Sequence, residues 1–204
     1  MAVNKKGQEI TSIWTPANVV TCVRIAFIPL FMVFSEMAFA QTSAGLAWLA
    51  FAIYLLLSLT DKVDGDLARK RGEVTDFGKF LDPIADKLLV FAALLILLEH
   101  QFVGVWTVFI IMFREFLVSA LRMVASANGE VIAADNLGKA KTAVTMLSLC
   151  GYLLFIALSI GGGATGVVEL VGTISWALMI AAVVLTVISG LQYFWNARHI
   201  VFRV

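Results

Sequence analysis

The chain is poor in cysteine and in charge for its length. Cys22 and Cys150 are the only two cysteines among 204 residues, and both fall in apolar segments, so there is neither a disulfide framework nor a metal-ligand cysteine spacing. Charged residues make up 14% of the chain and hydrophobic residues 61%, which is well above the apolar share of a soluble domain. Internal repeats, low-complexity tracts and linkers are also missing. These features indicate an integral membrane protein with a single domain.

Six apolar stretches approach or exceed the roughly 20 residues that a helix needs to cross a bilayer. The tripeptide Ala38-Phe39-Ala40 resembles a signal-peptidase site. However, the stretch before it carries Arg24 and is longer than a signal core, so we expect the first helix to be retained. The sequence predicts an all-α, polytopic membrane protein with six transmembrane helices at residues 17–40, 45–68, 80–98, 103–127, 139–160 and 168–195. They form a membrane domain over 17–197, between an interfacial N-terminal segment 1–16 and a short tail 198–204.

The distribution of positive charge predicts the orientation of these helices. None of the 15 lysines and arginines falls in the connections 35–44, 99–103 and 161–166, and basic residues concentrate on the cytoplasmic side of a membrane. We therefore expect those connections to face outward, and both termini and the acidic segment that follows Asp61 to face the cytoplasm. The net charge of +1 gives no indication of a nucleic-acid partner. Expected cytoplasmic interface aromatics are Trp14, Tyr193, Phe194 and Trp195, and expected solvated outer acids are Glu36, Glu99 and Glu169.

Two pairs of aspartates interrupt this apolar background. Asp61 and Asp64 are three residues apart, and Asp82 and Asp86 are four apart, so on helices each pair shares one face. If the chain reverses near Val74, both pairs lie at a similar depth on facing antiparallel helices, since each residue adds about 1.5 Å of rise. Carboxylates inside a membrane segment are costly, and function is the default reason for keeping them.

Four converging carboxylates repel one another unless cations neutralise them. Hard oxygen ligands favour Mg²⁺ or Mn²⁺, so the sequence predicts a site for two divalent ions. Gly65 and Gly78 leave room for the close approach of a ligand or a helix, and Arg69 offers a planar fork suited to phosphate. Together they suggest a polyphosphate substrate. Asp66 and Asp76 fall outside the shared faces and are expected to be solvated.

A second polar group lies further along the chain. Arg114, Glu115, Ser119 and Arg122 fall within an arc of about 140° on one helix. Gly138, Lys139 and Lys141 follow at the start of the next helix, where basic side chains oppose the helix dipole and an anion offsets that cost. A phosphate pocket is the expectation. Two alternatives remain: the lysines as topology anchors, and Arg114 and Glu115 as structural partners of other helices.

The acidic segment resembles the CDP-alcohol phosphotransferase family. Its signature D-x2-D-G-x2-A-R-x8-G-x3-D-x3-D matches here without a gap. The segments FLDPIADKLLV, REFLVSALR and LGKAKTAVTM, with SGLQYF near the C-terminus, resemble the branch of the family that forms phosphatidylglycerol phosphate. Near the N-terminus that branch has P-N-x-L-T-x-x-R, whereas this chain has Ala17 inserted after Pro16. The signature positions are Asp61, Asp64, Gly65, Ala68, Arg69, Gly78, Asp82 and Asp86.

The resemblance implies specific roles. Asp61, Asp64, Asp82 and Asp86 hold two Mg²⁺ or Mn²⁺ ions that bridge the diphosphate of CDP-diacylglycerol, and Asp86 is also the general base. The residues expected to bind the donor are Asn18, Thr21, Gly65, Arg69, Thr75 and Gly78. The family's six-helix homodimers imply a homodimer here.

The expected reaction transfers a phosphatidyl group from CDP-diacylglycerol to glycerol 3-phosphate, giving phosphatidylglycerol phosphate and CMP for phospholipid biosynthesis. The acceptor's phosphate is expected to bind Arg114, Arg122, Lys139 and Lys141. Three alternatives stay open. Another family member would make phosphatidylserine, cardiolipin or a phosphatidylinositol phosphate. A membrane prenyltransferase would need a second Asp-rich motif, which the later helices lack. A divalent-cation transporter would place its acids elsewhere than at the cytoplasmic helix ends.

Overall fold

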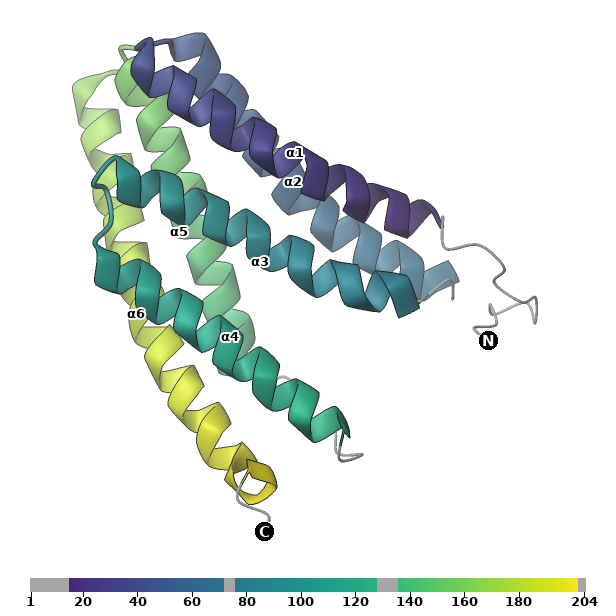
Figure 1. Cartoon of the computed structure of the whole chain (residues 1–204). Helices are drawn as coiled ribbons and strands as arrows, with labels where there is room; N and C mark the ends of the chain where they lie inside the picture. The colour runs from purple at the N-terminus through teal and green to yellow at the C-terminus, as the bar shows by residue number, and fades with distance from the viewer. Residues whose placement is uncertain (1–14, 72–75, 128–135, 202–204) are drawn as a thin grey trace. The chain divides into compact units, whose positions relative to one another are not determined.

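The computed structural model describes residues 15–71, 76–127 and 136–201, and these residues form six α-helices (Figure 1). The all-α prediction is therefore confirmed for the part of the chain described. All six helices overlap the six predicted stretches, and α6 continues well beyond the predicted end at residue 195. The helices are α1 (Pro16–Ala40), α2 (Ala44–Arg71), α3 (Asp76–Glu99), α4 (Val105–Ala127), α5 (Asn136–Ile160) and α6 (Thr165–Val201).

Within the described ranges, three helices are long and apolar enough to cross a membrane. They are the segments Asn18–Ala40, Asn136–Ile160 and Thr165–Asn196, which lie in α1, α5 and α6, while α2 contributes a shorter apolar segment, Ala44–Thr60. The polar second half of α2 and the stripe of charged residues on α4 account for their lower apolar content. Length and composition thus support a membrane protein.

The three connections that follow α1, α3 and α5 are short and end the preceding helix in the same way. Each contains one residue in the left-handed backbone region, with φ of 50° at Thr42, 61° at Gln101 and 70° at Gly162. Such a residue lets the chain leave a helix while the last carbonyls still accept hydrogen bonds. The predicted first connection, 35–44, is wrong in extent, because α1 runs to Ala40 and the Ser35 hydroxyl donates to the Phe31 carbonyl at 2.9 Å.

The chain forms two compact units. Unit 1 comprises Met1–Ile96 and Ile156–Gly163. Within it α1 packs along α2, with the buried ring of Phe31 5.3 Å from that of Tyr54. Ala38 and Ala47 form a small core with Ala157. Small side chains at this crossing allow the helices to approach closely, as is common between membrane helices.

Unit 2 comprises Leu97–Phe155 and Ala164–Val204. Here α4 packs against α6, and the Ser148 hydroxyl on α5 donates to the Ser175 carbonyl on α6 at 2.8 Å. The buried face of α6 has the alternating spacing of four and three residues that keeps side chains on one side of a helix. Its members are Ser175, Met179, Ala182, Thr186, Ser189 and Tyr193.

Candidate active site

The two aspartate pairs lie on consecutive helices of unit 1, as predicted. Asp61 and Asp64 belong to α2, and Asp82 and Asp86 belong to α3. α2 ends at Arg71, ten residues after Asp61, and Asp86 comes ten residues after the first residue of α3. Both pairs therefore lie up to about 15 Å along their helices from the ends joined by residues 72–75. The helix bounds are thus compatible with the predicted equal depth, and the convergence of the two pairs on facing helices stays a prediction.

Most side chains of the predicted metal site lie outside the described part of the structure. These are Asp61, Asp64, Arg69 and Asp82, together with Gly65 and the whole of Thr75. Asp86 is half-buried. Among the residues searched, no group of three histidine, cysteine or acidic side chains could hold a metal ion. The donor chemistry nevertheless fits, because four carboxylates supply the hard oxygen ligands that Mg²⁺ and Mn²⁺ favour.

The predicted nucleotide-side residues of α1 lie on a buried face of unit 1. Asn18 and Thr21 are each 2% exposed, and Arg24, three residues further on, is also 2% exposed. Thr15 caps the helix, because its hydroxyl accepts a hydrogen bond from the Asn18 amide at 3.3 Å. Gly78 on α3 is buried as well. The insertion of Ala17 therefore leaves Asn18 and Thr21 facing inward.

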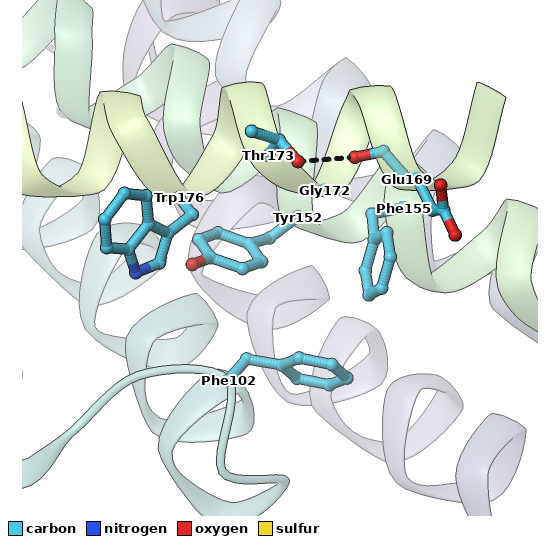
Figure 2. Close-up of a pocket in the computed structure, with 7 residues that line it drawn as sticks. All are labelled: Phe102, Tyr152, Phe155, Glu169, Gly172, Thr173 and Trp176. Carbon is cyan, nitrogen blue, oxygen red and sulfur yellow. Dashed lines mark hydrogen bonds between the residues drawn. The ribbon is translucent and has the colours of Figure 1, made fainter. Parts of the chain in front are cut away.

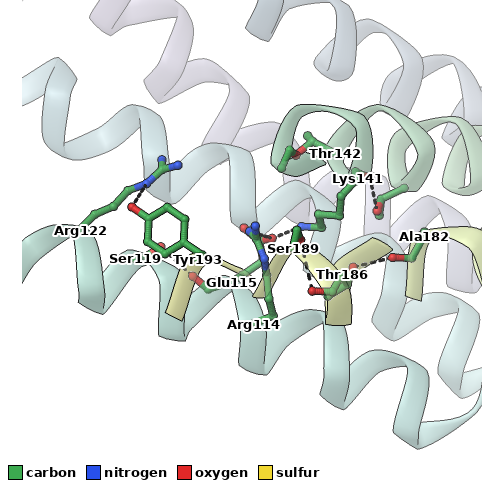
Figure 3. Close-up of polar contacts among 12 residues, drawn as sticks. Arg114, Glu115, Ser119, Arg122, Lys141, Thr142, Ala182, Thr186, Ser189 and Tyr193 are labelled. Carbon is green, nitrogen blue, oxygen red and sulfur yellow. Dashed lines mark hydrogen bonds and ion pairs between the residues drawn. The ribbon is translucent and has the colours of Figure 1, made fainter. Parts of the chain in front are cut away.

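A cluster of charged side chains joins the three helices of unit 2 (Figure 3). At its centre the Glu115 carboxylate of α4 is shared by two cations. Lys141 of α5 donates to it from its ammonium group, and Arg114 donates from Nη1 at 3.2 Å. Lys141 is buried, at 4% exposure. The alternative that each of these two residues pairs with another helix is confirmed for Glu115, which pairs with Lys141 of α5, whereas the ion pair of Arg114 is with Glu115 on its own helix. We call Arg114, Glu115, Arg122, Lys141 and Tyr193 the basic cluster.

Arg114 is held in place by close contact with two other helices. A Cβ atom at Gly190 of α6 would lie 3.0 Å from the Arg114 Cγ, and one at Gly138 of α5 would lie 3.5 Å from its Nη2. Glycine at 190 therefore lets the stem of Arg114 cross α6. Its Nε is buried and has no hydrogen-bond partner within the described residues. A buried donor of this kind is costly unless an acceptor reaches it, so the arrangement suits an anion.

Arg122 lies two turns further along α4 and uses a different partner. Its Nε donates to the Tyr193 hydroxyl at 3.1 Å, and the guanidinium carbon lies 5.5 Å from the centroid of the tyrosine ring. Arg122 itself is exposed. Tyr193 is 4% exposed and packs with Val118 and Leu121, so it faces the helices of unit 2, and its predicted depth at the membrane interface stays a prediction. Tyr193 orients the guanidinium of Arg122.

Two residues of the predicted polar group lie apart from these contacts. Lys139 is exposed, and since it precedes Lys141 by two residues it points about 200° away around α5. Ser119 turns back onto its own helix, with its hydroxyl donating to the Glu115 carbonyl at 2.7 Å. The structure thus brings Arg114 and Lys141 together, leaves Lys139 aside, and places Arg122 about 12 Å along α4 from Arg114.

The sequence reasoning assigned no site role to Glu115 or to Tyr193. Glu115 was visible as part of the polar stripe, but its partner on another helix was not. Tyr193 could have been found from the spacing on α6, because it follows the buried Thr186 and Ser189 by seven and four residues. That periodicity marks an inward face.

Comparison with known proteins points to one family. A family model described as CDP-alcohol phosphatidyltransferase matches residues 14–188. The chain is 46% identical to the CDP-diacylglycerol–glycerol-3-phosphate 3-phosphatidyltransferase of Bacillus subtilis over 145 residues. This aligned region is 67% of this chain and 75% of the relative. The protein of the same name from Rickettsia bellii is 38% identical over 87% of this chain and 92% of its own length. A probable phosphatidylglycerophosphate synthase of Mycobacterium tuberculosis is 35% identical over 87% of this chain and 78% of the relative.

Proposed function

Because the chain belongs to the CDP-alcohol phosphatidyltransferase family, we propose that it transfers a phosphatidyl group from CDP-diacylglycerol to glycerol 3-phosphate. The products are phosphatidylglycerol phosphate and CMP, and the reaction serves phospholipid biosynthesis. The names of relatives that are 30–46% identical support this assignment. The observation that supports glycerol 3-phosphate as the acceptor substrate is the basic cluster. There the buried Nε of Arg114 has no hydrogen-bond partner among the described residues, and a phosphate oxygen could accept its hydrogen bond.

The donor belongs to unit 1 in this proposal. Asn18 and Thr21 on the buried face of α1, with Gly65, Arg69, Thr75 and Gly78, bind the CDP part of the lipid. The family is generally dependent on divalent metal. Asp61, Asp64, Asp82 and Asp86 would hold two Mg²⁺ or Mn²⁺ ions, which when bound neutralise the negative charge of the diphosphate.

The acceptor's phosphate belongs to unit 2. Arg122, with Nε fixed by Tyr193, keeps its two terminal nitrogens for phosphate oxygens, in the fork geometry that suits this anion. Arg114 offers its buried Nε. Glu115 offsets one positive charge and holds Lys141 in place. Lys141 therefore adds to the positive electrostatic potential at the phosphate, and its ammonium group is not free to bind the phosphate directly. Lys139, exposed at the start of α5, extends the positive surface that attracts a dianion.

The chemical step is a displacement at phosphorus. Asp86 accepts the proton of the glycerol 3-phosphate C1 hydroxyl. The hydroxyl oxygen forms a bond to the phosphorus that carries diacylglycerol, and the bond from that phosphorus to the bridging diphosphate oxygen breaks. CMP leaves with the electron pair of that bond. Asp86 suits the role because it is half-buried on α3, one turn after Asp82.

The same proposal includes a topology and an assembly. All six helices cross a bacterial cell membrane, both termini and the active site face the cytoplasm, and residues 17–197 form one catalytic membrane domain that works as a homodimer. The absence of lysine and arginine from the three connections supports this orientation.

Single cysteines at Thr42 and Gly162, in a variant lacking Cys22 and Cys150, are expected to react with an impermeant maleimide from outside the cell. If these cysteines reacted only after cell lysis, the connections would face the cytoplasm and the proposed orientation would be wrong.

An acceptor panel tests the function directly. Purified protein receives CDP-diacylglycerol, a divalent salt and one acceptor: glycerol 3-phosphate, serine, inositol phosphate or phosphatidylglycerol. CMP release and the mass of the lipid product are measured. We expect CMP and phosphatidylglycerol phosphate with glycerol 3-phosphate only, and none with the Asp86→Asn variant. CMP release with another acceptor would keep the family chemistry but refute the acceptor, and no release with any would refute the enzyme.

A further inference from the structure

A pocket of about 390 Å³ opens in unit 2, between α5, α6 and the connection that follows α3 (Figure 2). It falls within the size range of small-molecule sites. Four aromatic rings and one carboxylate take part in its lining. The lining residues are Phe102, Tyr152, Phe155, Glu169, Gly172, Thr173 and Trp176.

The rings hold one another in fixed orientations. Phe102 meets Phe155 edge to face, with centroids 5.8 Å apart and planes at 82°, and its centroid lies 6.2 Å from that of Tyr152. Phe155 lies against Gly172, where an added Cβ would come within 2.9 Å of two ring atoms. Trp176 lies one turn further along α6 and is 59% exposed. The pocket therefore presents aromatic faces and edges from three different elements.

Glu169 gives this pocket a negative charge. It is exposed, as expected of a solvated acid, but it lies in the second turn of α6 and not in a loop, where it also lines the pocket. Thr173 donates to the backbone carbonyl of Glu169 at 2.8 Å and not to its carboxylate. The chain has no lysine or arginine from residue 88 to 113 or from 142 to 197, and these stretches contain every lining residue. The negative charge is thus not balanced by a basic residue of the surrounding sequence.

The pocket is distinct from the proposed active site. Tyr152 lies eleven residues after Lys141 on α5, about 16 Å along the helix, and Trp176 lies 17 residues before Tyr193 on α6. No residue of the basic cluster lines the pocket. In the proposed topology this end of α5 and α6 faces outward, away from the substrates.

We propose that this aromatic pocket binds an organic ammonium ion. Aromatic faces attract such cations through the ring quadrupole, and cages of aromatic residues recognise quaternary ammonium groups in this way. Glu169 adds charge complementarity. Ammonium groups are carried both by the headgroups of zwitterionic lipids and by small soluble compounds, and both fit the chemistry. The inference concerns a second ligand and does not depend on the transfer reaction.

A pair of nearly isosteric compounds separates cation recognition from simple apolar binding. Choline and 3,3-dimethylbutan-1-ol have nearly the same shape, but only choline is charged. Binding to the purified wild-type protein in maltoside detergent is measured by calorimetry, without turnover. We expect choline to bind about two- to fivefold more tightly, the range of a cation on solvent-exposed aromatic rings. Equal affinities, or no saturable binding of choline, would overturn the proposal.

Variants then locate the site. Glu169→Gln is expected to remove most of choline's advantage, and Trp176→Leu to weaken choline more than the alcohol. Glu99→Gln is the matched control, because Glu99 is an exposed acid outside the pocket and should leave both affinities unchanged. The KM of each variant for glycerol 3-phosphate is measured as a separate check on folding, and a value equal to that of the wild type shows that the variant is folded. Full choline selectivity in Glu169→Gln and in Trp176→Leu would overturn the assignment to this pocket.

Two membrane compositions distinguish the source of the ligand. The protein is placed in nanodiscs of phosphatidylglycerol alone, or with phosphatidylcholine added, and choline is titrated again. Weaker apparent choline affinity in the second set identifies a lipid headgroup as the competing ligand. Unchanged affinity supports a soluble ammonium compound and excludes the phosphatidylcholine headgroup at this site.

Discussion

Removing the guanidinium of Arg122 tests whether the basic cluster binds the acceptor's phosphate. Arg122→Ala deletes a charged donor that Tyr193 holds through a 3.1 Å hydrogen bond. A hydrogen bond to a charged group contributes about 1.5–3 kcal/mol, so the KM for glycerol 3-phosphate should rise about ten- to a hundredfold. The KM for CDP-diacylglycerol should change little, because the donor residues belong to the other unit.

Tyr193→Phe separates orientation from charge. It keeps the ring beside Arg122 and removes only the hydroxyl that accepts from Nε. The bond has a charged donor and contributes up to about 1.5–3 kcal/mol, but water can replace the hydroxyl beside the exposed Arg122, so acceptor KM should rise less than in Arg122→Ala, with kcat nearly unchanged. Tyr54→Phe is the matched control, since Tyr54 is a fully buried tyrosine of unit 1 and the same change there should leave acceptor KM unaffected.

The assay is CMP release, with glycerol 3-phosphate titrated at saturating CDP-diacylglycerol and the reverse. Lys139→Ala should raise acceptor KM less than Arg122→Ala does, because Lys139 lies on the far side of α5 from Lys141. If Arg122→Ala and Tyr193→Phe both kept acceptor KM within about twofold, smaller than any lost charged contact, the cluster would serve only structure and topology. An equal rise in the KM of both substrates would refute its assignment to the acceptor.

The remaining predictions concern the acids. Asp61→Asn and Asp82→Asn should each abolish CMP release while the protein still inserts, and EDTA should do the same to the wild type; turnover in excess EDTA would contradict metal dependence. Asp86→Asn should lower kcat by about 10² or more with a smaller effect on donor binding, and an unchanged rate with a normal pH profile would refute the general base. Glu115→Gln should lower stability in detergent unfolding by about 3 kcal/mol because it leaves the buried Lys141 ammonium without its carboxylate. Adding Lys141→Met should recover part of that loss, and strictly additive effects would show that the pair is uncoupled.

The fold followed from the sequence because its main determinants are local. The structure has a helix at each of the six apolar stretches, although only three of the helices are long and apolar enough to cross a membrane over the residues described. The errors lie at helix ends. The connection 35–44 overlapped the predicted helix 17–40, and the helix was right: the Ser35 hydroxyl donates to the Phe31 carbonyl within α1, a local contact that a polar residue makes in an apolar helix. Likewise the polar residues after Trp195 suggested a tail, whereas α6 continues to Val201.

For the acidic part of the site, the structure confirms the helices that carry the aspartates, while the convergence of the four carboxylates stays a prediction. Spacings of three and four residues place aspartates on one face of a helix whatever the tertiary structure, and the position of a turn fixes their register. The partners of the basic residues were not predictable in this way. Which cation Glu115 meets depends on how α5 lies against α4, and nothing in the local sequence of either helix specifies that contact.

The contacts of Glu115 change the expected ranking of the basic residues by their contribution to phosphate binding. Counted along the sequence, Arg114, Arg122, Lys139 and Lys141 are four equal charges for a phosphate. In the folded unit Glu115 takes the ammonium of Lys141 and one nitrogen of Arg114, and a carboxylate beside a phosphate site repels the ligand unless cations already engage it. We therefore expect the phosphate of the proposed acceptor to contact Arg122 and the remaining nitrogens of Arg114 first. Loss of Arg122 should harm acceptor binding most, and loss of Lys141 should harm the fold of unit 2 as much as the affinity.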